Sequence, residues 1–182
     1  VYRVAGEGTK EFSEMKAGDT LEVMGPLGNG FTMKNEKAII IGGGIGIPPM
    51  LELAKQLDAE KTVVLGYRTS TFLKEVCDVK IATEDGSQGA KGTVIDAIEK
   101  YGVEGKVIYA CGPMPMLKAL AAYAEEHGME AQISLEERMA CGIGACLGCI
   151  CKSKTKDHHT NVNNTRICKD GPVFDAKEVV FS

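Results

Sequence analysis

Four cysteines near the carboxyl end of the chain restrict what it can fold into more than any other feature. Cys141 and Cys146 are separated by four residues, and Cys149 follows after two more. Cys168 lies further along the chain. This is the spacing by which the four thiolates of plant-type ferredoxins hold a two-iron, two-sulfur cluster. The sequence therefore predicts a 2Fe-2S site with these four cysteines as its ligands.

The residues between these thiols suit a loop that wraps a cluster. Gly142, Gly144 and Gly148 lie between the cysteines, and glycine enters left-handed backbone conformations at little cost. Such a loop can bring backbone N–H groups close to sulfur atoms. We therefore expect backbone donors as well as thiolates around the cluster.

Two other uses of cysteine compete with this interpretation. Zinc sites usually show two short C-x-x-C pairs, whereas here the first pair is longer and the last cysteine stands alone. Disulfides are typical of oxidising compartments and small secreted proteins. An odd number of cysteines, seven in 182 residues, fits a reducing cytosol better. Structural zinc remains the alternative to iron.

Three cysteines are left outside the predicted ligand set. The spacing selects Cys149 rather than Cys151, so we expect Cys151 to pack beside the cluster. Cys77 and Cys111 lie far from the cluster in sequence. Isolated buried cysteines usually behave as small apolar side chains, so packing is the first expectation for both.

Length and composition limit the remaining possibilities. A chain of 182 residues has room for one ordinary domain with attachments. Its net charge of -4 argues against a nucleic-acid surface. We find no apolar run near the roughly 18 to 20 residues of a membrane span and no secretory leader pattern. A soluble, cytoplasmic protein that binds neither nucleic acid nor membrane is expected.

The first 31 residues are rich in glycine, proline and short apolar alternations, which are typical of antiparallel strands. Strands are predicted at residues 1–4 and 21–23. Because the first strand begins at Val1 rather than at an initiator methionine, we expect the chain to be a segment of a longer protein. So few strands cannot close a barrel, which makes this part the expected end of a β domain.

An apolar run at residues 38–41 leads into a glycine loop and then a helical apolar stripe. This order points backbone N–H groups and a helix N-terminus at a phosphate. The candidate nucleotide-binding residues are Gly42, Gly43, Gly44 and Gly46. The usual dinucleotide fingerprint is not met, because Ile47 takes the third glycine position and no acidic residue follows the next strand. A tight turn without a ligand is the alternative.

The alternation of strands and helices continues along the chain. Strands are predicted at residues 38–41, 62–65, 79–82, 106–110 and 131–135, and helices after the glycine loop and at residues 92–101 and 114–127. Gly128 is the expected C-cap. Such repeats predict a parallel sheet that is covered on both faces and binds its ligand at the carboxyl ends of the strands.

Cys111, Gly112 and Pro113 follow the fourth predicted strand. The glycine would let a ligand approach the backbone, and the Cys111 thiol would face the crevice where a nicotinamide or flavin ring could lie. Ordinary packing of this thiol is an equal alternative.

The segment after the clustered cysteines is polar. Residues 152–166 are expected to form a surface loop that returns the chain to Cys168, with His158 and His159 exposed to solvent rather than bound to a metal. A turn is predicted at residues 171–174 and a short closing strand at residues 178–181.

Two motifs are the most specific in the chain: Ser-Leu-Glu-Glu-Arg-Met-Ala-Cys-Gly-Ile-Gly-Ala-Cys at residues 134–146, and Cys-Lys-Asp-Gly-Pro-Val-Phe at residues 168–174. Together with residues 25–31, 42–49 and 111–114, they resemble the electron-transfer subunits of NAD-dependent dihydroorotate dehydrogenases, within the ferredoxin reductase superfamily. The resemblance covers the whole chain.

The resemblance implies an α/β fold with a five-stranded parallel nucleotide-binding sheet and helices on both faces. The remnant of an FAD-binding β-barrel would precede this sheet, and a small 2Fe-2S domain would follow it. The implied boundaries are residues 1–33 for the barrel part, 34–134 for the NAD-binding domain and 135–182 for the cluster domain. The implied FAD contacts are Val1, Tyr2, Arg3, Gly8 and Thr9.

The resemblance also implies a function in pyrimidine biosynthesis. Electrons would pass from FMN on a partner catalytic dihydroorotate dehydrogenase subunit, through the cluster and FAD, to NAD. The two subunits would form a heterotetramer, and no catalytic acid or base would be needed on this chain.

Other assignments stay open on the sequence alone. One is the flavin and iron–sulfur subunit of a sulfide dehydrogenase or an NAD-dependent ferredoxin:NADP oxidoreductase, which shares this domain order. Another is a nucleotide-sensing module with structural zinc. Metal analysis would distinguish it from the other two, because they require iron and acid-labile sulfide instead of zinc. Arg68 could contact a 2'-phosphate and favour NADP, or pair with a neighbouring acid; the resemblance favours NAD.

Overall fold

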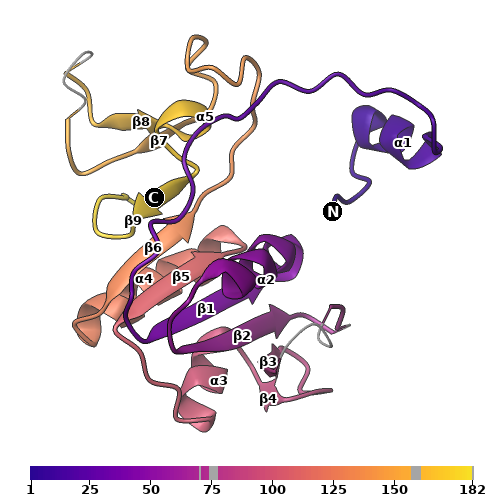
Figure 1. The fold of residues 1–182 in the computed structure, drawn as a ribbon. Helices are drawn as coiled ribbons and strands as arrows, with labels where there is room; N and C mark the ends of the chain where they lie inside the picture. The colour runs from indigo at the N-terminus through magenta and orange to yellow at the C-terminus, as the bar shows by residue number, and fades with distance from the viewer. Residues whose placement is uncertain (70, 74–77, 157–160, 182) are drawn as a thin grey trace.

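The computed structural model describes residues 1–69, 71–73, 78–156 and 161–181, and its main element is a mostly parallel sheet (Figure 1). The strand order is β4-β3-β2-β1-β5-β6-β9. The bounds are β1 (Ala38–Gly43), β2 (Lys61–Tyr67), β3 (Val79–Thr83), β4 (Ala90–Lys91), β5 (Val107–Cys111), β6 (Glu130–Ser134) and β9 (Val173–Asp175). Every adjacent pair is parallel except β6 and β9, which are antiparallel.

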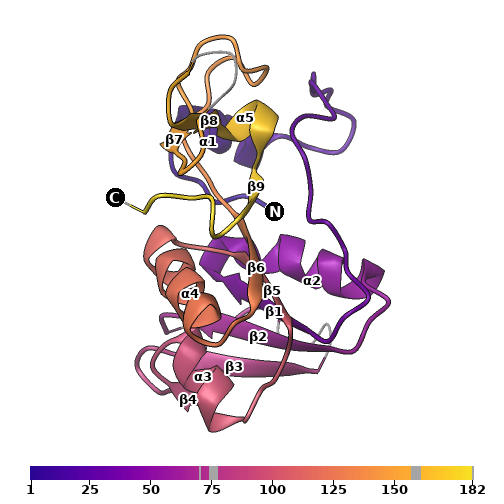
Figure 2. The same cartoon turned by 90° about the vertical axis from the view of Figure 1, so that its left-hand side faces the viewer.

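Helices cover both faces of this sheet, as the sequence predicted. Figure 2 shows α2 (Ile47–Gln56) on one side and α3 (Val94–Lys100) with α4 (Met114–Glu126) on the other. Ile40 belongs to the apolar cluster of α2, whereas Ile39 and Ile41 belong to that of α3 and α4. A strand buried on both faces reads as a continuous apolar run, which explains the sequence of β1. No described helix combines the length and the apolar character that a bilayer crossing demands.

The five predicted strands correspond to β1, β2, β3, β5 and β6. The structure adds β4 and β9, which are two and three residues long. The turn predicted at residues 171–174 is wrong in its second half, because Val173 and Phe174 pair with the edge strand β6. The closing strand predicted at residues 178–181 is also wrong, since the structure gives Val179 one isolated bridge, to Ser153.

The strands predicted at residues 1–4 and 21–23 are not formed. The described structure has α1 (Glu7–Glu14) in this region, with extended or irregular chain around it. Helix α1 buries none of its residues and stands away from the sheet (Figure 1). A strand needs a neighbour for its backbone hydrogen bonds, and among the described residues no strand lies beside these segments.

A smaller unit, which we call the cluster lobe (residues 135–172), lies between β6 and β9. It contains the hairpin β7 (Ile150–Lys152) and β8 (Asn164–Arg166) and the single helical turn α5 (Ile167–Asp170). The polar loop predicted at residues 152–166 therefore starts and ends in paired strands. His158 and His159 lie outside the described residues, as does Cys77.

Residues 27–34, which we call the strap, connect the cluster lobe with the sheet. The Asn29 N–H donates to the carbonyl of Gly171 at 2.7 Å. Further along, the Thr32 N–H donates to the Gln132 side chain at 2.8 Å, and the Lys34 N–H donates to the Tyr109 hydroxyl at 2.9 Å. The strap therefore bonds to both units through its main chain.

Replacing Tyr109 by phenylalanine tests the sheet end of the strap. Tyr109 is fully buried, and its hydroxyl accepts from Lys34 and donates to the Thr32 carbonyl at 3.2 Å. Losing these bonds should lower the free energy of unfolding by about 1 kcal/mol, measured by urea denaturation. Tyr101→Phe, on a ring exposed at the end of α3, is the control and should change nothing measurable. Equal effects of both changes would contradict the role given to the strap.

Candidate cluster-binding and nucleotide-binding sites

Three of the four predicted ligands lie on one irregular loop, at residues 141–149, and Cys168 lies on α5. The loop turns through left-handed conformations at Gly142, with φ of 70°, and at Gly144, with φ of 83°. Leu147 also takes a positive φ of 58°. The predicted use of two of the three glycines is thus confirmed.

Backbone N–H groups of this loop point at its sulfur atoms. Ala145 and Cys146 donate to the Cys141 sulfur at 3.3 and 3.4 Å, and Gly148 donates to the Cys146 sulfur at 3.4 Å. These contacts are the backbone donors expected from the sequence. Such hydrogen bonds help to set the reduction potential of a cluster held by these thiolates.

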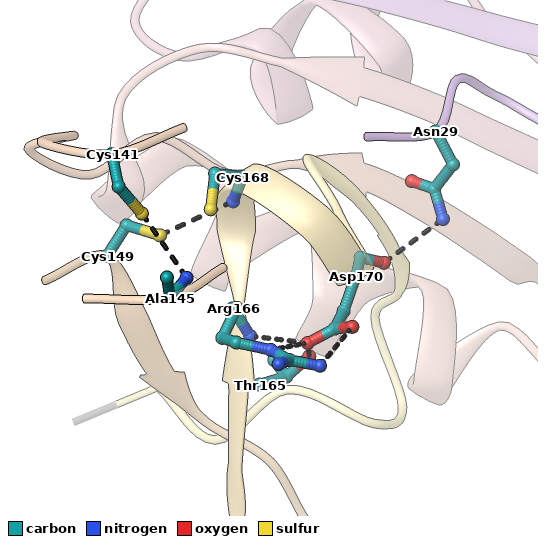
Figure 3. Close-up of polar contacts among 8 residues, drawn as sticks. All are labelled: Asn29, Cys141, Ala145, Cys149, Thr165, Arg166, Cys168 and Asp170. Atoms are coloured by element: carbon teal, nitrogen blue, oxygen red, sulfur yellow. Dashed lines mark hydrogen bonds and ion pairs between the residues drawn. The ribbon is translucent and has the colours of Figure 1, made fainter. Parts of the chain in front are cut away.

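Cys149 and Cys168 form the inner half of the site. Both are buried, and the Cys168 N–H donates to the Cys149 sulfur at 3.4 Å. Figure 3 shows the sulfur atoms of Cys141, Cys149 and Cys168 directed toward the same space. Cys141 is half-buried and Cys146 is exposed. The fold therefore brings the distant Cys168 to the loop and leaves one side of the site near solvent.

The surroundings of the thiols shift their acidity in opposite directions. Backbone N–H donation, first from Cys146 and then from Ile143, lowers the pKa of the Cys141 thiol to about 6. The side-chain hydrogen bond with Cys149 raises the pKa of the Cys168 thiol. Cysteine binds a metal as its thiolate. The backbone donors of the loop therefore favour the deprotonated, metal-binding form of Cys141.

The predicted nucleotide loop and the Cys111 segment lie together at the carboxyl edge of the sheet. Gly42 of β1 stands opposite Cys111 of β5 in the parallel register. A Cβ atom at Gly46 would lie 2.3 Å from the Cys111 carbonyl oxygen, and one at Gly112 would lie 3.1 Å from the Gly43 Cα. Glycine is therefore required where the two segments touch. The structure brings together both sets of residues that the sequence singled out.

The outer side of this loop is open. The chain passes through the short turn η1 (Gly44–Gly46) into α2, which begins at Ile47. Gly44 has φ of 53°, and a Cβ atom there would meet no atom within 4 Å. Pro113 lies across from Gly43, 3.0 Å from where a Cβ atom there would be. A phosphate group can approach the helix N-terminus from this open side.

Cys111 is half-buried at this edge, and burial raises the pKa of its thiol. A thiol of this kind is neutral and apolar in character. Both interpretations from the sequence, packing and contact with a ring, are compatible with this position.

The structure does not bring the residues implied for FAD to either of these sites. The five residues lie on the N-terminal segment that ends in α1 (Figure 1). All of them but Thr9 are exposed. The Thr9 hydroxyl accepts from the Ala5 and Gly6 N–H groups at 2.9 and 3.1 Å. Gly8 and Thr9 lie in the first turn of α1, where N–H groups have no acceptor within the helix.

Sequence reasoning missed three residues beside the cysteines. Arg166 and Asp170 flank Cys168 and form an ion pair, and Asn29 of the strap donates to the Asp170 carbonyl. The i,i+4 spacing of an arginine and an aspartate around Cys168 was a usable signal. Asn29 gave none, because its partner is 141 residues away.

Comparison with known proteins agrees with this arrangement. The family described as the iron-sulfur cluster binding domain of dihydroorotate dehydrogenase B matches residues 136–180. The dihydroorotate dehydrogenase B (NAD(+)) electron transfer subunit of Caldanaerobacter subterraneus subsp. tengcongensis is 48% identical over 187 residues, covering 100% of this chain and 74% of that protein. The subunit of the same name from Fusobacterium nucleatum is 44% identical, covering 98% of this chain and 73% of that protein.

A solved structure is also similar over nearly the whole chain. It is an NADH-dependent reduced ferredoxin-NADP oxidoreductase, studied for flavin-based electron bifurcation. The TM-score is 0.83 at 33% sequence identity, covering 98% of this chain and 67% of that one. The chain therefore belongs to the family of electron transfer subunits of dihydroorotate dehydrogenase B, an NAD(+)-linked oxidoreductase, and contains that family's iron–sulfur cluster-binding domain.

Proposed function

We propose that this chain passes electrons from a partner catalytic dihydroorotate dehydrogenase subunit to NAD, through a 2Fe-2S cluster and FAD, in pyrimidine biosynthesis. The partner would hold FMN, where dihydroorotate is oxidised, and the subunits would assemble as a heterotetramer in the cytoplasm. The observation that carries the proposal is the presence, on one chain, of a glycine-lined nucleotide edge and of four cysteines on the 141–149 loop and α5, three of which direct their sulfur atoms toward the same space.

The side chains present fit a 2Fe-2S cluster. We propose Cys141, Cys146, Cys149 and Cys168 as its ligands, because four thiolates are the usual set for such a cluster. Among the described residues no three acidic, histidine or cysteine side chains already surround one point at ligand spacing. Gly142 and Gly144 take left-handed conformations, which let the loop turn around a cluster.

The carboxyl edge of the sheet fits NAD. We propose that Gly42, Gly43, Gly44 and Gly46 hold its diphosphate at the start of α2, and that Cys111, Gly112 and Pro113 lie beside the nicotinamide. The preference for NAD over NADP follows the names of the relatives, in which NAD(+) is printed.

For FAD we propose contacts from the N-terminal segment, at Val1, Tyr2, Arg3, Gly8 and Thr9. Arg3 supplies a cation for the diphosphate, and the first-turn N–H groups at Gly8 and Thr9 supply donors. When bound, a flavin supplies both hydride exchange with a nicotinamide and one-electron exchange with an iron–sulfur cluster. The proposed domain boundaries are residues 1–33, 34–134 and 135–182.

A second candidate function is favoured by the likeness to the ferredoxin-NADP oxidoreductase structure. In that case the same cluster and nucleotide edge would serve electron exchange with ferredoxin instead of dihydroorotate. The two candidates differ in the partner and in the electron donor, and they agree on the metal.

Co-purification of the full-length protein with its catalytic partner tests the proposal. We expect iron and acid-labile sulfide in the complex, and NAD reduction that depends on dihydroorotate. Iron, sulfide and bound FAD without dihydroorotate-dependent NAD reduction would contradict the main proposal and favour the second candidate. Zinc in place of iron would contradict both.

A further inference from the structure

Cys168 is held between two residues that bind each other. One carboxylate oxygen of Asp170 accepts from the Arg166 backbone N–H and from its Nε, both at 2.9 Å, and the other accepts from Nη2 at 3.0 Å (Figure 3). The Thr165 hydroxyl approaches the same carboxylate at 3.5 Å. Two parallel bonds between an arginine and a carboxylate are strong and fix orientation. The pair therefore closes the chain around the turn that carries Cys168.

This closure matters because α5 cannot hold its own shape. It spans four residues, and isolated helices far shorter than about 12 residues are unstable. The side chains of Arg166 and Asp170 are 24% and 34% exposed, so solvent screens this pair less than an open surface pair. The geometry of the turn thus depends on the ion pair more than on helix propensity.

The turn is also set against the loop that carries the other three cysteines. The Ile167 N–H donates to the Cys149 carbonyl at 3.0 Å. A Cβ atom at Gly144 would lie 3.1 Å from the Lys169 Cβ and 3.5 Å from the Arg166 Cδ. The stem of Arg166 therefore covers the middle of the cysteine loop while its guanidinium group holds Asp170.

The strap holds the same turn from the other side. The Asn29 side-chain amide donates to the Asp170 carbonyl at 3.0 Å, and its backbone N–H donates to the Gly171 carbonyl. Gly28 lies directly against Gly171, since a Cβ atom at Gly28 would be 2.2 Å from the Gly171 oxygen. The turn is therefore held by Arg166 from its own start, by the cysteine loop and by the strap.

We infer that Arg166 and Asp170 are positioning residues that set Cys168 in place for the cluster, with Asn29 as their anchor. The inference deepens the proposed function and rests on it, because it gives these residues a task only if Cys168 is a ligand. Partners that orient a metal ligand typically change metal affinity about 10- to 100-fold when they are replaced.

Asp170→Asn in the full-length complex is the direct test, because asparagine keeps the size and loses the charge. We expect release of iron to a chelator at least about 10-fold faster than from the unchanged complex, and an altered electron paramagnetic resonance spectrum of the reduced protein. Arg166→Lys keeps the charge without the paired bonds. Its rate of iron release should therefore lie between the rates of the unchanged complex and of the Asp170→Asn variant. Glu52→Gln, which removes the Glu52–Lys55 pair on the exposed side of α2, is the control and should match the unchanged complex.

The outcomes separate this inference from the proposed function. An unchanged complex without iron or sulfide overturns the proposed function, and the inference with it. An unchanged complex with both, together with an Asp170→Asn variant of identical release rate and spectrum, overturns the inference alone. Should Asp170→Asn fail to fold, Arg166→Lys decides by the same two measurements.

Discussion

Replacing Cys168 by alanine is expected to abolish cluster binding. Iron in the purified full-length protein should fall from about two atoms per chain to near zero, because a 2Fe-2S cluster needs four ligands. Cys168 is buried beside Cys149, and the Cys168 N–H donates to the Cys149 sulfur. Iron and acid-labile sulfide analysis measures this, together with visible absorption.

Cys151→Ala is the matched control for this change. Cys151 lies two residues after Cys149 in β7, where it stands opposite Thr165 of β8. The control variant should keep its iron, because the cysteine spacing and the hydrogen bonds to sulfur select Cys149. Loss of iron on Cys151→Ala with retention on Cys168→Ala would show that the ligand assignment is wrong.

The second large effect is expected from Gly46→Ala. The added Cβ atom would lie 2.3 Å from the Cys111 oxygen and 2.8 Å from the Gly112 nitrogen, and neither main-chain atom can rotate away. The glycine loop must therefore separate from the Cys111 segment. We expect the free energy of unfolding to fall by about 3 kcal/mol and nicotinamide-dependent activity to fall about 100-fold, since a displacement of about 1 Å is sufficient for such a loss.

Gly44→Ala separates packing from backbone conformation in the same loop. Gly44 has φ of 53° and open space around a Cβ atom, so alanine there should cost about 1 to 2 kcal/mol from left-handed strain alone. Urea denaturation and steady-state kinetics with NADH compare the two variants. If Gly44→Ala proved as damaging as Gly46→Ala, contact with Cys111 would not be the reason for glycine at position 46.

The features that the sequence predicted well depend on local or strongly patterned signals. The run Ile39, Ile40 and Ile41 predicts a strand buried on both faces, because each residue finds a helix whichever way it points. The cysteine spacing predicts its loop because ligand geometry leaves few alternatives. The glycines at positions 42, 43, 44 and 46 predict a loop between a strand and a helix, and the chain passes there from β1 through η1 into α2.

The features that could not be predicted depend on distant partners. Strand β9 has three residues and forms because the edge of β6 offers it hydrogen bonds, while β4 is too short for any pattern to appear. The apolar alternation of residues 1–4 predicts a strand only where a neighbouring strand exists. The contact of Asn29 with Asp170 joins residues 141 positions apart, so no local pattern can indicate it.

Strand β9 has a mechanical consequence for electron transfer. The chain leaves the sheet at β6, forms the cluster lobe and returns at β9, where Phe174 stands opposite Ile133. Main-chain bonds from Leu135 to Pro172 and from Ala176 to Ala131, both 2.8 Å, tether the lobe at its two ends. A unit held in this way cannot swing like a hinged lid. The position of the cysteine loop relative to the carboxyl edge of the sheet is therefore set by the fold, so electron transfer between groups bound at these two places would not wait for a domain to close.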